Sequence, residues 1–272
     1  MHPFDPRRLR QTVLRMAFAG KTAHIACAFS LIEILAVLYR SHLRLGKQPG
    51  MAWRDYLVLS KGHGVMAQYA CHYELGWISD ADIEAYCSDG TRLKGLSDGH
   101  VPGLEVSSGS LGHGLSIAVG LALAAKRRRS EQRCIAIVGD GEMNEGPIWE
   151  AILFAAHHEL GNLVIIVDEN GHQAMGPTGE IMRLGKLADK FSAFGCESRE
   201  VDGHDEHALD MAIGELLSSP SPCPRALVAR TIKGHGISFM ENDNRWHYTR
   251  LTPQTFAAAM VELDRQGKQV AA

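Results

Sequence analysis

The sequence predicts an α/β protein with a doubly wound, mostly parallel sheet flanked by helices. Two observations carry that prediction: short, continuous apolar runs at 134–138, 163–167 and 226–229, and stretches of helical character between them. Such runs are typical of strands that are buried on both faces of a parallel sheet. The alternation of strand and helix then predicts right-handed crossovers, with helices covering both faces.

The first half of the chain is predicted to form helices and one long loop. Leu9, Val13 and Met16 recur at helical spacing, and the pattern repeats after Ser30, a residue suited to cap a helix. A long segment rich in Gly, Ser and Pro is typical of a functional loop. The expected elements are helices at 8–18, 30–39 and 115–126 and a loop at 89–114.

The second half is expected to hold the sheet and its crossover helices. Helices are predicted at 147–159, 184–194 and 206–217. The segment 264–272 is expected to be a short flexible tail, because terminal residues are often poorly ordered. We therefore predict a single domain over residues 1–272, whose N-terminal third consists of helices and loops.

Composition excludes several classes of protein. The 272 residues suffice for a sizeable core, and 45% hydrophobic with 22% charged residues is ordinary for a globular protein. A net charge of −3 argues against nucleic acid or a membrane surface as partner, and no apolar run is long enough to span a bilayer. The N-terminus lacks an apolar signal segment, so a cytoplasmic location is expected. The six cysteines form no CxxC pair, which predicts reduced thiols.

Two short motifs look like nucleotide-binding signatures but fail their spacing. Gly-Lys-Thr at 20–22 looks like the end of a P-loop, yet Arg15 stands where that motif needs a glycine. Gly-His-Gly at 112–114 begins like a dinucleotide-binding fingerprint, yet Ile117 replaces its third glycine and no strand-like run precedes it. We therefore expect neither a P-loop nor a nicotinamide site.

A stronger constellation follows two of the predicted strands. Gly-Asp-Gly-Glu at 139–142 ends one strand and Asn170 follows the next, so the two lie side by side if the strands are adjacent. A carboxylate and an amide oxygen are hard ligands suited to Mg²⁺ or Ca²⁺, and Mg²⁺ usually shares its shell with water and phosphate. The glycines let the backbone approach a ligand closely. The pattern therefore predicts a metal-bridged diphosphate, although a strand followed by Gly-Asp-Gly is equally compatible with a simple turn.

These residues also carry a resemblance to a known family. The segment 137–146 (Ile-Val-Gly-Asp-Gly-Glu-Met-Asn-Glu-Gly), with Asn170 downstream, resembles the thiamine diphosphate motif. The surrounding sequence resembles the transketolase family over nearly its whole length. The matching segments are Leu-Ser-Lys-Gly-His-Gly at 59–64, Pro-Gly-Leu-Glu-Val-Ser-Ser-Gly-Ser-Leu-Gly-His-Gly at 102–114, Phe-Ala-Ala-His-His at 154–158 and Lys-Gly-His-Gly-Ile-Ser-Phe-Met-Glu-Asn at 233–242.

The resemblance implies the thiamine diphosphate-binding fold and one subunit of a split transketolase. Full-length transketolases carry a diphosphate-binding domain, a pyrimidine-binding domain and a third, C-terminal domain, and this sequence resembles only the first. The implied activity is transfer of a two-carbon ketol unit from a ketose or its phosphate to an aldose or its phosphate. The implied cofactors are thiamine diphosphate and Mg²⁺, or Ca²⁺ in its place.

The resemblance also implies roles for individual residues around the cofactor. Asp140, the Asn170 side chain and the His172 backbone carbonyl are expected to hold the metal ion, and Gly141 to offer its N–H to a phosphate. The expected cofactor-binding residues are His63, Gly109, Ser110, Leu111, Gly139, Asp140, Gly141, Glu142 and Asn170.

Histidines and one glutamate are implied to act in catalysis. His24 and His247 match substrate-facing histidines and, with His63, are expected to be catalytic, because imidazoles near sugar oxygens suit hydrogen bonding and proton transfer near neutral pH. His100 is expected to be a further substrate-facing histidine. Glu145 matches a catalytic carboxylate that faces the partner domain, although an acidic residue there would equally favour the start of the following helix.

The sequence departs from the family at two places near the expected substrate. Ala-His-Ile-Ala at 23–26 replaces the family's Gly-His-Pro-Gly, and Tyr248 stands where the family has glycine. A substrate pocket that differs from those of other transketolases is therefore expected, and with it an unusual ketose or acceptor.

The resemblance further implies a partner protein. The glutamate that activates the cofactor in the family lies in the pyrimidine-binding domain, which this sequence lacks. We expect a C-terminal transketolase subunit that carries that domain, an α₂β₂ assembly, and no activity of this chain alone. Two alternatives remain open: a subunit of another thiamine diphosphate enzyme, acting in 2-oxo acid decarboxylation or acyl or acyloin transfer, and a non-catalytic, cofactor-binding regulatory subunit.

Overall fold

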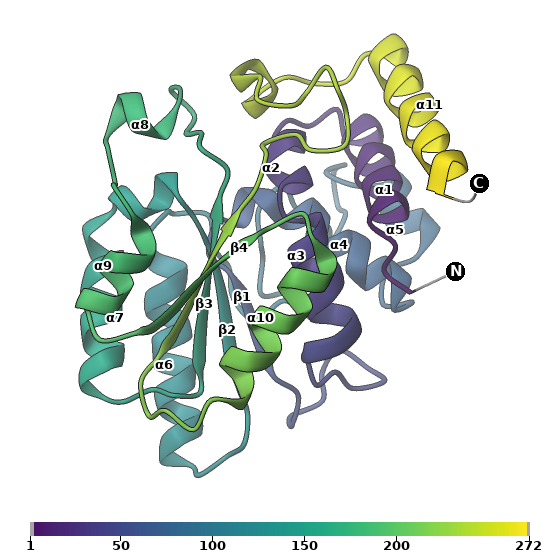
Figure 1. The fold of residues 1–272 in the computed structure, drawn as a ribbon. Coiled ribbons are helices and arrows are strands. Elements are labelled where there is room, and N and C mark those ends of the chain that lie inside the picture. Colours follow the sequence, from purple (N-terminus) through teal and green to yellow (C-terminus); the bar gives the residue numbers. More distant parts are fainter. Residues whose placement is uncertain (1–2, 271–272) are drawn as a thin grey trace.

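A five-stranded, wholly parallel sheet forms the centre of the molecule (Figure 1). The computed structural model describes the backbone of residues 3–270 and the side chains of residues 3–267. The strands pair in the order β1-β2-β3-β5-β4, and every pair runs parallel. The strands are β1 (Tyr56–Leu59), β2 (Cys134–Gly139), β3 (Leu163–Glu169), β4 (Glu197–Asp202) and β5 (Arg225–Arg230).

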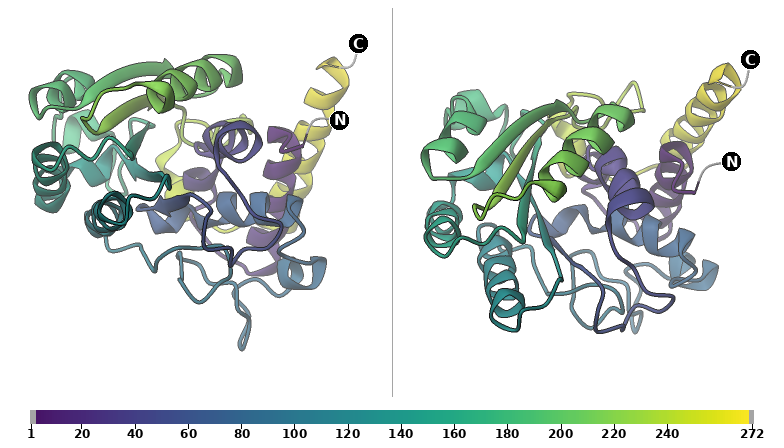
Figure 2. Two further views of the ribbon diagram at one scale, coloured as in Figure 1. Left: turned by 90° about the horizontal axis from the view of Figure 1, so that it is seen from below. Right: turned by 60° about the horizontal axis from the view of Figure 1, so that its bottom comes forward.

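Helices cover both faces of the sheet, as the sequence predicts (Figure 2). In β2, Ile135 and Ile137 belong to the core on one face, whereas Ala136 and Val138 belong to the core on the other, which explains the unbroken apolar run. One face packs against α6 (His113–Arg127), α7 (Gly146–His157) and α9 (Leu187–Ala193). The other packs against α1 (Pro6–Ala19), α2 (Ile25–Phe29), α3 (Ile32–Val37), α4 (Val65–Glu74), α5 (Asp80–Glu84), α10 (Glu206–Ser218) and α11 (Pro253–Val270).

Polar residues define where several helices begin. The Asp5 side chain accepts the backbone N–H of Arg7 at 2.8 Å and caps α1, whose first residue is proline. Asp205 caps α10 in the same way, because its carboxylate accepts the N–H groups of His207 and Ala208. Shorter elements complete the chain: a π-helical turn at Leu38–His42, 3₁₀ turns at Gly62–Gly64, Gly141–Asn144 and Asn244–His247, and α8 (Thr178–Ile181).

Two strands and five helices of the described chain were not predicted. β1 has only four residues, and β4 reads Glu-Ser-Arg-Glu-Val-Asp, with Val201 its one buried residue. β1 is apolar but too short to be recognised as a strand, whereas β4 is an edge strand with one neighbour and needs no continuous apolar run. The helices α2, α4, α5, α8 and α11 were also missed, and the helix predicted at 30–39 is divided into α3 and the π-helical turn.

The prediction of a flexible tail from residue 264 is wrong for the residues that the structure describes. α11 continues to Val270, and residues 271–272 lie outside the described part of the chain. Leu263 is fully buried, Asp264 accepts from Gln11 at 2.9 Å and Gln266 donates to the Gly236 carbonyl at 3.0 Å. The Gln11 contact and the packing of α11 on α1 bring the start of α1 close to the end of α11 (Figures 1 and 2).

In a parallel sheet the carboxyl ends of all strands lie at the same edge. The segments that follow β1, β2, β3 and β5 therefore meet at the carboxyl edge, where the sequence motifs around 61, 140, 170 and 233 also lie. Within residues 3–270 no helix combines the length and the apolar character needed to cross a membrane.

Candidate active site

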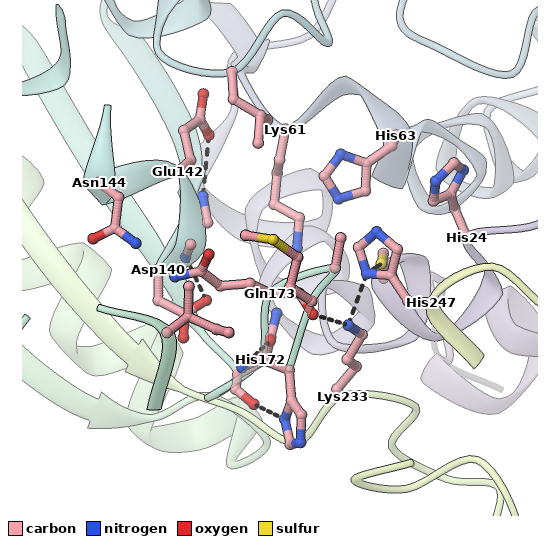
Figure 3. Close-up of a pocket in the computed structure, with 18 of the residues that line it drawn as sticks. His24, Lys61, His63, Asp140, Glu142, Asn144, His172, Gln173, Lys233 and His247 are labelled. Atoms are coloured by element: carbon pink, nitrogen blue, oxygen red, sulfur yellow. Dashed lines mark hydrogen bonds between the residues drawn. The ribbon is translucent and has the colours of Figure 1, made fainter. Parts of the chain in front are cut away.

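A cavity of about 590 Å³ opens at the carboxyl edge of the sheet. Carboxyl and amide side chains gather on one side of it and three histidines on the other (Figure 3). The cavity is lined by His24, Cys27, Lys61, His63, Leu96, Gly109, Leu111, Gly139, Asp140, Gly141, Glu142, Asn144, Glu145, Asn170, His172, Gln173, Ala174, Met175, Ile181, Met182, Lys233 and His247.

Asp140 directly follows β2 and is almost completely buried. Its carboxylate accepts the N–H of Gly141 at 2.8 Å, the N–H of Gly171 at 2.9 Å and the hydroxyl of Thr178 at 2.9 Å. Burial, followed by the nearby charge of Asp168, raises the pKa of Asp140. Among the described residues none forms an ion pair with this carboxylate, so a bound cation would offset the cost of burying its charge.

Asn170 follows β3, which is paired with β2 as the sequence predicts. Its amide nitrogen donates to Asp168 at 3.1 Å, which orients the oxygen Oδ1 away from that carboxylate. Oδ1 accepts the N–H of His172 at 3.1 Å and keeps a second lone pair. Because the backbone N–H of Gly171 binds Asp140, the two predicted metal ligands are held against one another by the chain itself.

The divalent cation implied by the sequence fits this donor set. Asp140 and Asn170 provide a buried carboxylate and an amide oxygen, the hard ligands that Mg²⁺ and Ca²⁺ prefer. A Cβ added at Gly141 would lie 2.9 Å from the Gln173 side chain, so only glycine leaves this backbone open. Asp140 and Gly141 both line the cavity, so the carboxylate and this backbone face the space that a ligand would occupy.

A buried ion pair lies behind the predicted ligands, and sequence reasoning assigned it no role. Lys61, just after β1, forms an ion pair with Asp168, and Ser30 and Thr231 donate their hydroxyls to the same carboxylate. Burial alone would raise the pKa of Asp168, but the Lys61 ammonium and the hydroxyls outweigh it and hold the pKa below its usual value. The signal was present, since Lys61 lies inside the Ser-Lys-Gly-His motif.

Three of the predicted histidines form one cluster. The ring of His24 lies 5.3 Å from that of His63 and 5.4 Å from that of His247, and the last two are 5.8 Å apart. Burial and then the charge of a nearby lysine lower the pKa of all three, to about 3 for His247. The imidazoles are therefore neutral near pH 7, each with one donor and one acceptor nitrogen.

Lys233 is the second residue whose role the sequence did not reveal. It is buried, and its ammonium lies 2.8 Å from Nδ1 of His247 and 3.1 Å from the side-chain oxygen of Asn244. Burial lowers the pKa of Lys233. Since the ammonium only donates, Nδ1 of His247 accepts, and the proton of this neutral ring sits on Nε2, where it is free to donate to a ligand. Cys27 also lies 3.6 Å from the same nitrogen.

Glu142, a predicted cofactor-binding residue, also holds the surrounding backbone in place. Its carboxylate accepts the hydroxyl of Ser60 at 2.5 Å and the backbone N–H groups of Gly112 at 2.9 Å and Gly139 at 3.2 Å. Burial raises the pKa of Glu142. The side chain lines the cavity, but its oxygens tie the 109–112 loop to the ends of β1 and β2.

The remaining predicted residues divide into two groups. Gly109, Leu111 and Glu145 line the cavity, whereas the exposed Ser110 is not among the lining residues. Glu145 precedes α7 without a side-chain cap, so its carboxylate is not used to begin that helix through a hydrogen bond.

The structure does not bring His100 into the cavity. Its side chain is 95% exposed and lies 2.8 Å from Asp98, whose carboxylate also accepts the backbone N–H of His100. Ser107 donates to the same carboxylate and to no cavity residue. This local turn holds the histidine at the surface, and its predicted contact with substrate has no support from the cavity of the described chain.

The chain is similar to known proteins over most of its length. Residues 9–266 match the family model "Transketolase, thiamine diphosphate binding domain". An apulose-4-phosphate transketolase subunit from Phocaeicola vulgatus is 34% identical over 258 residues, which cover 94% of this chain and 92% of the relative. A 6-deoxy-6-sulfo-D-fructose transketolase subunit from Clostridium sp. is 37% identical over 246 residues, which cover 90% of this chain and 89% of the relative.

Solved transketolase structures share the fold. The Campylobacter jejuni enzyme superimposes with a TM-score of 0.85 at 25% identity, over 95% of this chain and 43% of that one. The Leishmania mexicana enzyme superimposes with a TM-score of 0.82 at 25% identity, over 98% of this chain and 45% of that one. The chain thus spans less than half the length of these enzymes, but nearly the full length of the two relatives described as subunits.

Proposed function

This chain belongs to the transketolase family, and from that premise we propose that it is the N-terminal, cofactor-binding subunit of a two-subunit, thiamine diphosphate-dependent transketolase. Its reaction would be the transfer of a two-carbon ketol unit from a ketose or ketose phosphate to an aldose or aldose phosphate. The relatives described as transketolase subunits support this, because their matches cover 94%, 88% and 90% of the chain. The proposed location is the cytoplasm.

One observation carries the proposal: adjacent strand ends place Asp140 and Asn170 together beside glycine backbone. We propose that Asp140, the Asn170 oxygen and the His172 carbonyl hold Mg²⁺, or Ca²⁺, and that the N–H of Gly141 binds a phosphate oxygen. When bound, thiamine diphosphate supplies the thiazolium carbanion that the reaction needs. The chain's own contribution is placement and electrostatics.

The histidine cluster would meet the sugar. His24, His63 and His247 are neutral and adjoining, so together they can donate hydrogen bonds to hydroxyls and accept from them as bonds to the substrate change. Lys233 fixes His247 with its Nε2 proton free to donate. A proton moved at that atom remains close to two lysines, which disfavours a lasting imidazolium and returns the ring to neutrality.

The proposed partner is a C-terminal subunit with the pyrimidine-binding domain and the activating glutamate, in an α₂β₂ assembly. The described surface offers support, because several large apolar side chains are exposed around the cavity and on α6 and α7. They are Leu96, Ile117, Leu153, Phe154, Met175 and Met182.

A reconstitution assay tests this function. The chain is mixed with the product of its gene neighbour that encodes a pyrimidine-binding domain, together with thiamine diphosphate, Mg²⁺ and panels of ketose donors and aldose acceptors. Ketol transfer by the mixture, and by neither protein alone, is the expected result. Cofactor binding without transfer for any donor would refute the transketolase reaction and favour another thiamine diphosphate reaction or a regulatory role.

A further inference from the structure

A second cluster of ionisable side chains lies behind the cavity and takes no part in the site described above. Glu33 of α3 is buried and receives both terminal nitrogens of Arg10, at 2.7 and 2.9 Å. Nδ1 of His204 lies 3.0 Å from the same carboxylate. Burial opposes the charge of Glu33, but Arg10 and then His204 outweigh it and lower the pKa to about 2. The carboxylate is therefore ionised.

The cluster has the spacing of a metal site but not its chemistry. Potential ligand atoms of Glu33, His204 and His235 all lie within 4.8 Å of one another. However, both oxygens of Glu33 are occupied by Arg10, and the rings of His204 and His235 are stacked at 3.7 Å rather than convergent. A guanidinium at this distance would repel a cation.

The hydrogen bonds of His204 fix its tautomer. Nε2 lies 2.7 Å from the backbone nitrogen of Ile232, whose N–H only donates, so Nε2 must be an acceptor. The proton then sits on Nδ1 and is donated to Glu33. His204 therefore links a buried carboxylate on α3 to one backbone amide at the end of β5.

That amide belongs to the short connection that delivers Lys233 to the cavity. β5 ends at Arg230, the N–H of Thr231 binds the Glu169 carbonyl at 3.1 Å, and Ile232 is the next residue. Beyond Lys233 the chain turns, with the N–H of Gly234 bound to the Ala26 carbonyl. Ile232 is thus the one residue between Thr231, which is still hydrogen-bonded to β3, and Lys233. Its N–H is bound by His204.

We propose that His204 is a positioning residue for Lys233. Its neutral ring, held by Glu33 and Arg10, accepts the Ile232 N–H and so sets the backbone from which the lysine reaches Nδ1 of His247. Arg10 strengthens the arrangement, because its Nε donates to the carbonyl of His235 at 2.8 Å, on the far side of the lysine. Only the activity readout below rests on the proposed function.

Two variants separate the bonds of His204. In His204→Asn the amide nitrogen reaches the place of Nδ1 and still donates to Glu33, but the side chain is too short to accept from Ile232. In His204→Gln the amide oxygen reaches the place of Nε2 and accepts that N–H. His207→Gln, at an exposed position of α10, is the matched control.

The first measurement is amide hydrogen exchange of Ile232 in this chain alone. Exchange should be about tenfold faster in His204→Asn, the effect of losing one hydrogen bond, and nearly unchanged in His204→Gln. The opposite order would overturn the proposal, because it would show that His204 acts only by satisfying Glu33. Unchanged exchange in both variants would overturn it as well. Urea unfolding of each variant confirms that the fold is kept.

The second measurement is a double-mutant cycle with Lys233→Met in the reconstituted enzyme. His204→Asn should lower kcat/KM about 10- to 100-fold, His204→Gln should restore most of it, and neither should matter once Lys233 is Met. Equal losses in both backgrounds would show that His204 does not act through Lys233. The cycle is repeated on cofactor Kd, so that an enzyme without turnover still gives a result. If reconstitution yields no transketolase, only the proposed function fails, and the exchange data still decide the role of His204.

Discussion

At the residue scale, the buried carboxylate of Asp140 is the centre of the proposed site. Three neutral donors surround it, and no described residue forms an ion pair with it. Asp140→Asn keeps the shape and removes the charge, so we expect thiamine diphosphate to bind at least about 100-fold more weakly in the presence of Mg²⁺. Isothermal titration of the reconstituted enzyme measures this.

The matched control is Asp189→Asn on α9, a solvent-exposed carboxylate that does not line the cavity. Its Kd should equal that of the unmodified enzyme. If Asp140→Asn also binds normally, Asp140 is not a metal ligand, and the cofactor site must be sought elsewhere in the cavity.

The histidine cluster makes stability depend on pH. An unfolded histidine has a pKa of about 6.5, whereas burial and the lysines lower the pKa of His247 to about 3 in the folded chain. Between these values the unfolded chain binds more protons, so the free energy of unfolding falls as pH drops from about 6.5 towards 3, and is fully present above 6.5.

Replacing His247 by Gln should reduce the slope of the unfolding free energy against pH, by an amount that corresponds to at most one bound proton. Urea unfolding at a series of pH values between 7.5 and 4.5 measures the slope for the original chain and the variant, with His207→Gln as control for the substitution itself. Equal slopes for the original chain and His247→Gln would contradict the low pKa.

At the scale of single elements, the start of α6 depends on a glycine. Gly112 has a φ of +88°, and a Cβ there would lie 2.8 Å from Cβ of Glu145. Gly112→Ala should therefore destabilise the chain by about 1–3 kcal/mol and displace the 109–111 loop from the cavity. The free energy of unfolding in urea measures the first effect, and cofactor Kd the second.

Gly120 offers the comparison within the same helix. It lies in the exposed middle of α6, and a Cβ there would meet nothing within 4 Å. Gly120→Ala should leave the free chain equally stable or more stable by up to about 1 kcal/mol, because alanine favours helix. A loss at Gly120 comparable to that at Gly112 would contradict the assignment of the Gly112 effect to its positive φ and its contact with Glu145.

The elements also show what the sequence could and could not predict. Central strands such as β2 and β3 were predicted because burial on both faces demands unbroken apolar runs. From these strands the adjacency of Asp140 and Asn170 followed, since parallel neighbours end at one edge. The polar β4 gave no such signal. An edge strand with one buried residue shows neither a continuous apolar run nor an alternation of apolar and polar residues.

The same reasoning explains why Lys61 and Lys233 were assigned no role. Each lies in a segment that matches the family, but a lysine's partner is fixed only by which strands become neighbours. Asp168 pairs with Lys61 across β2, a relation that needs the complete strand order. His100 was assigned a role at the substrate, but a local turn with Asp98 holds it at the surface, outside the cavity.

At the scale of the whole molecule, Arg10 joins the helical layer to the segment after β5. It is buried, pairs with Glu33 and donates to the carbonyls of Phe29 and His235. Arg10→Met leaves a buried carboxylate without its cation, so we expect a loss of about 3–5 kcal/mol in the free energy of unfolding.

Arg15 on the same helix is the control, since its ion pair with Asp80 is largely solvated. Arg15→Met should change the free energy of unfolding by no more than about 1 kcal/mol. Urea unfolding of the two variants side by side provides the test. A cost at Arg10 as small as that at Arg15 would show that the buried network does not hold the layers together.

The residues around the cavity come from the start of α2 and from the segments that follow β1, β2, β3 and β5. No pair of adjacent elements folded by itself would present the full set, so a ligand of this cavity recognises only the completed sheet. At a hundred times its Kd, such a ligand adds about 2.7 kcal/mol to the work of unfolding any part of that sheet. Proteases would then encounter chiefly the unliganded chain, and the lifetime of the protein would follow the supply of that ligand.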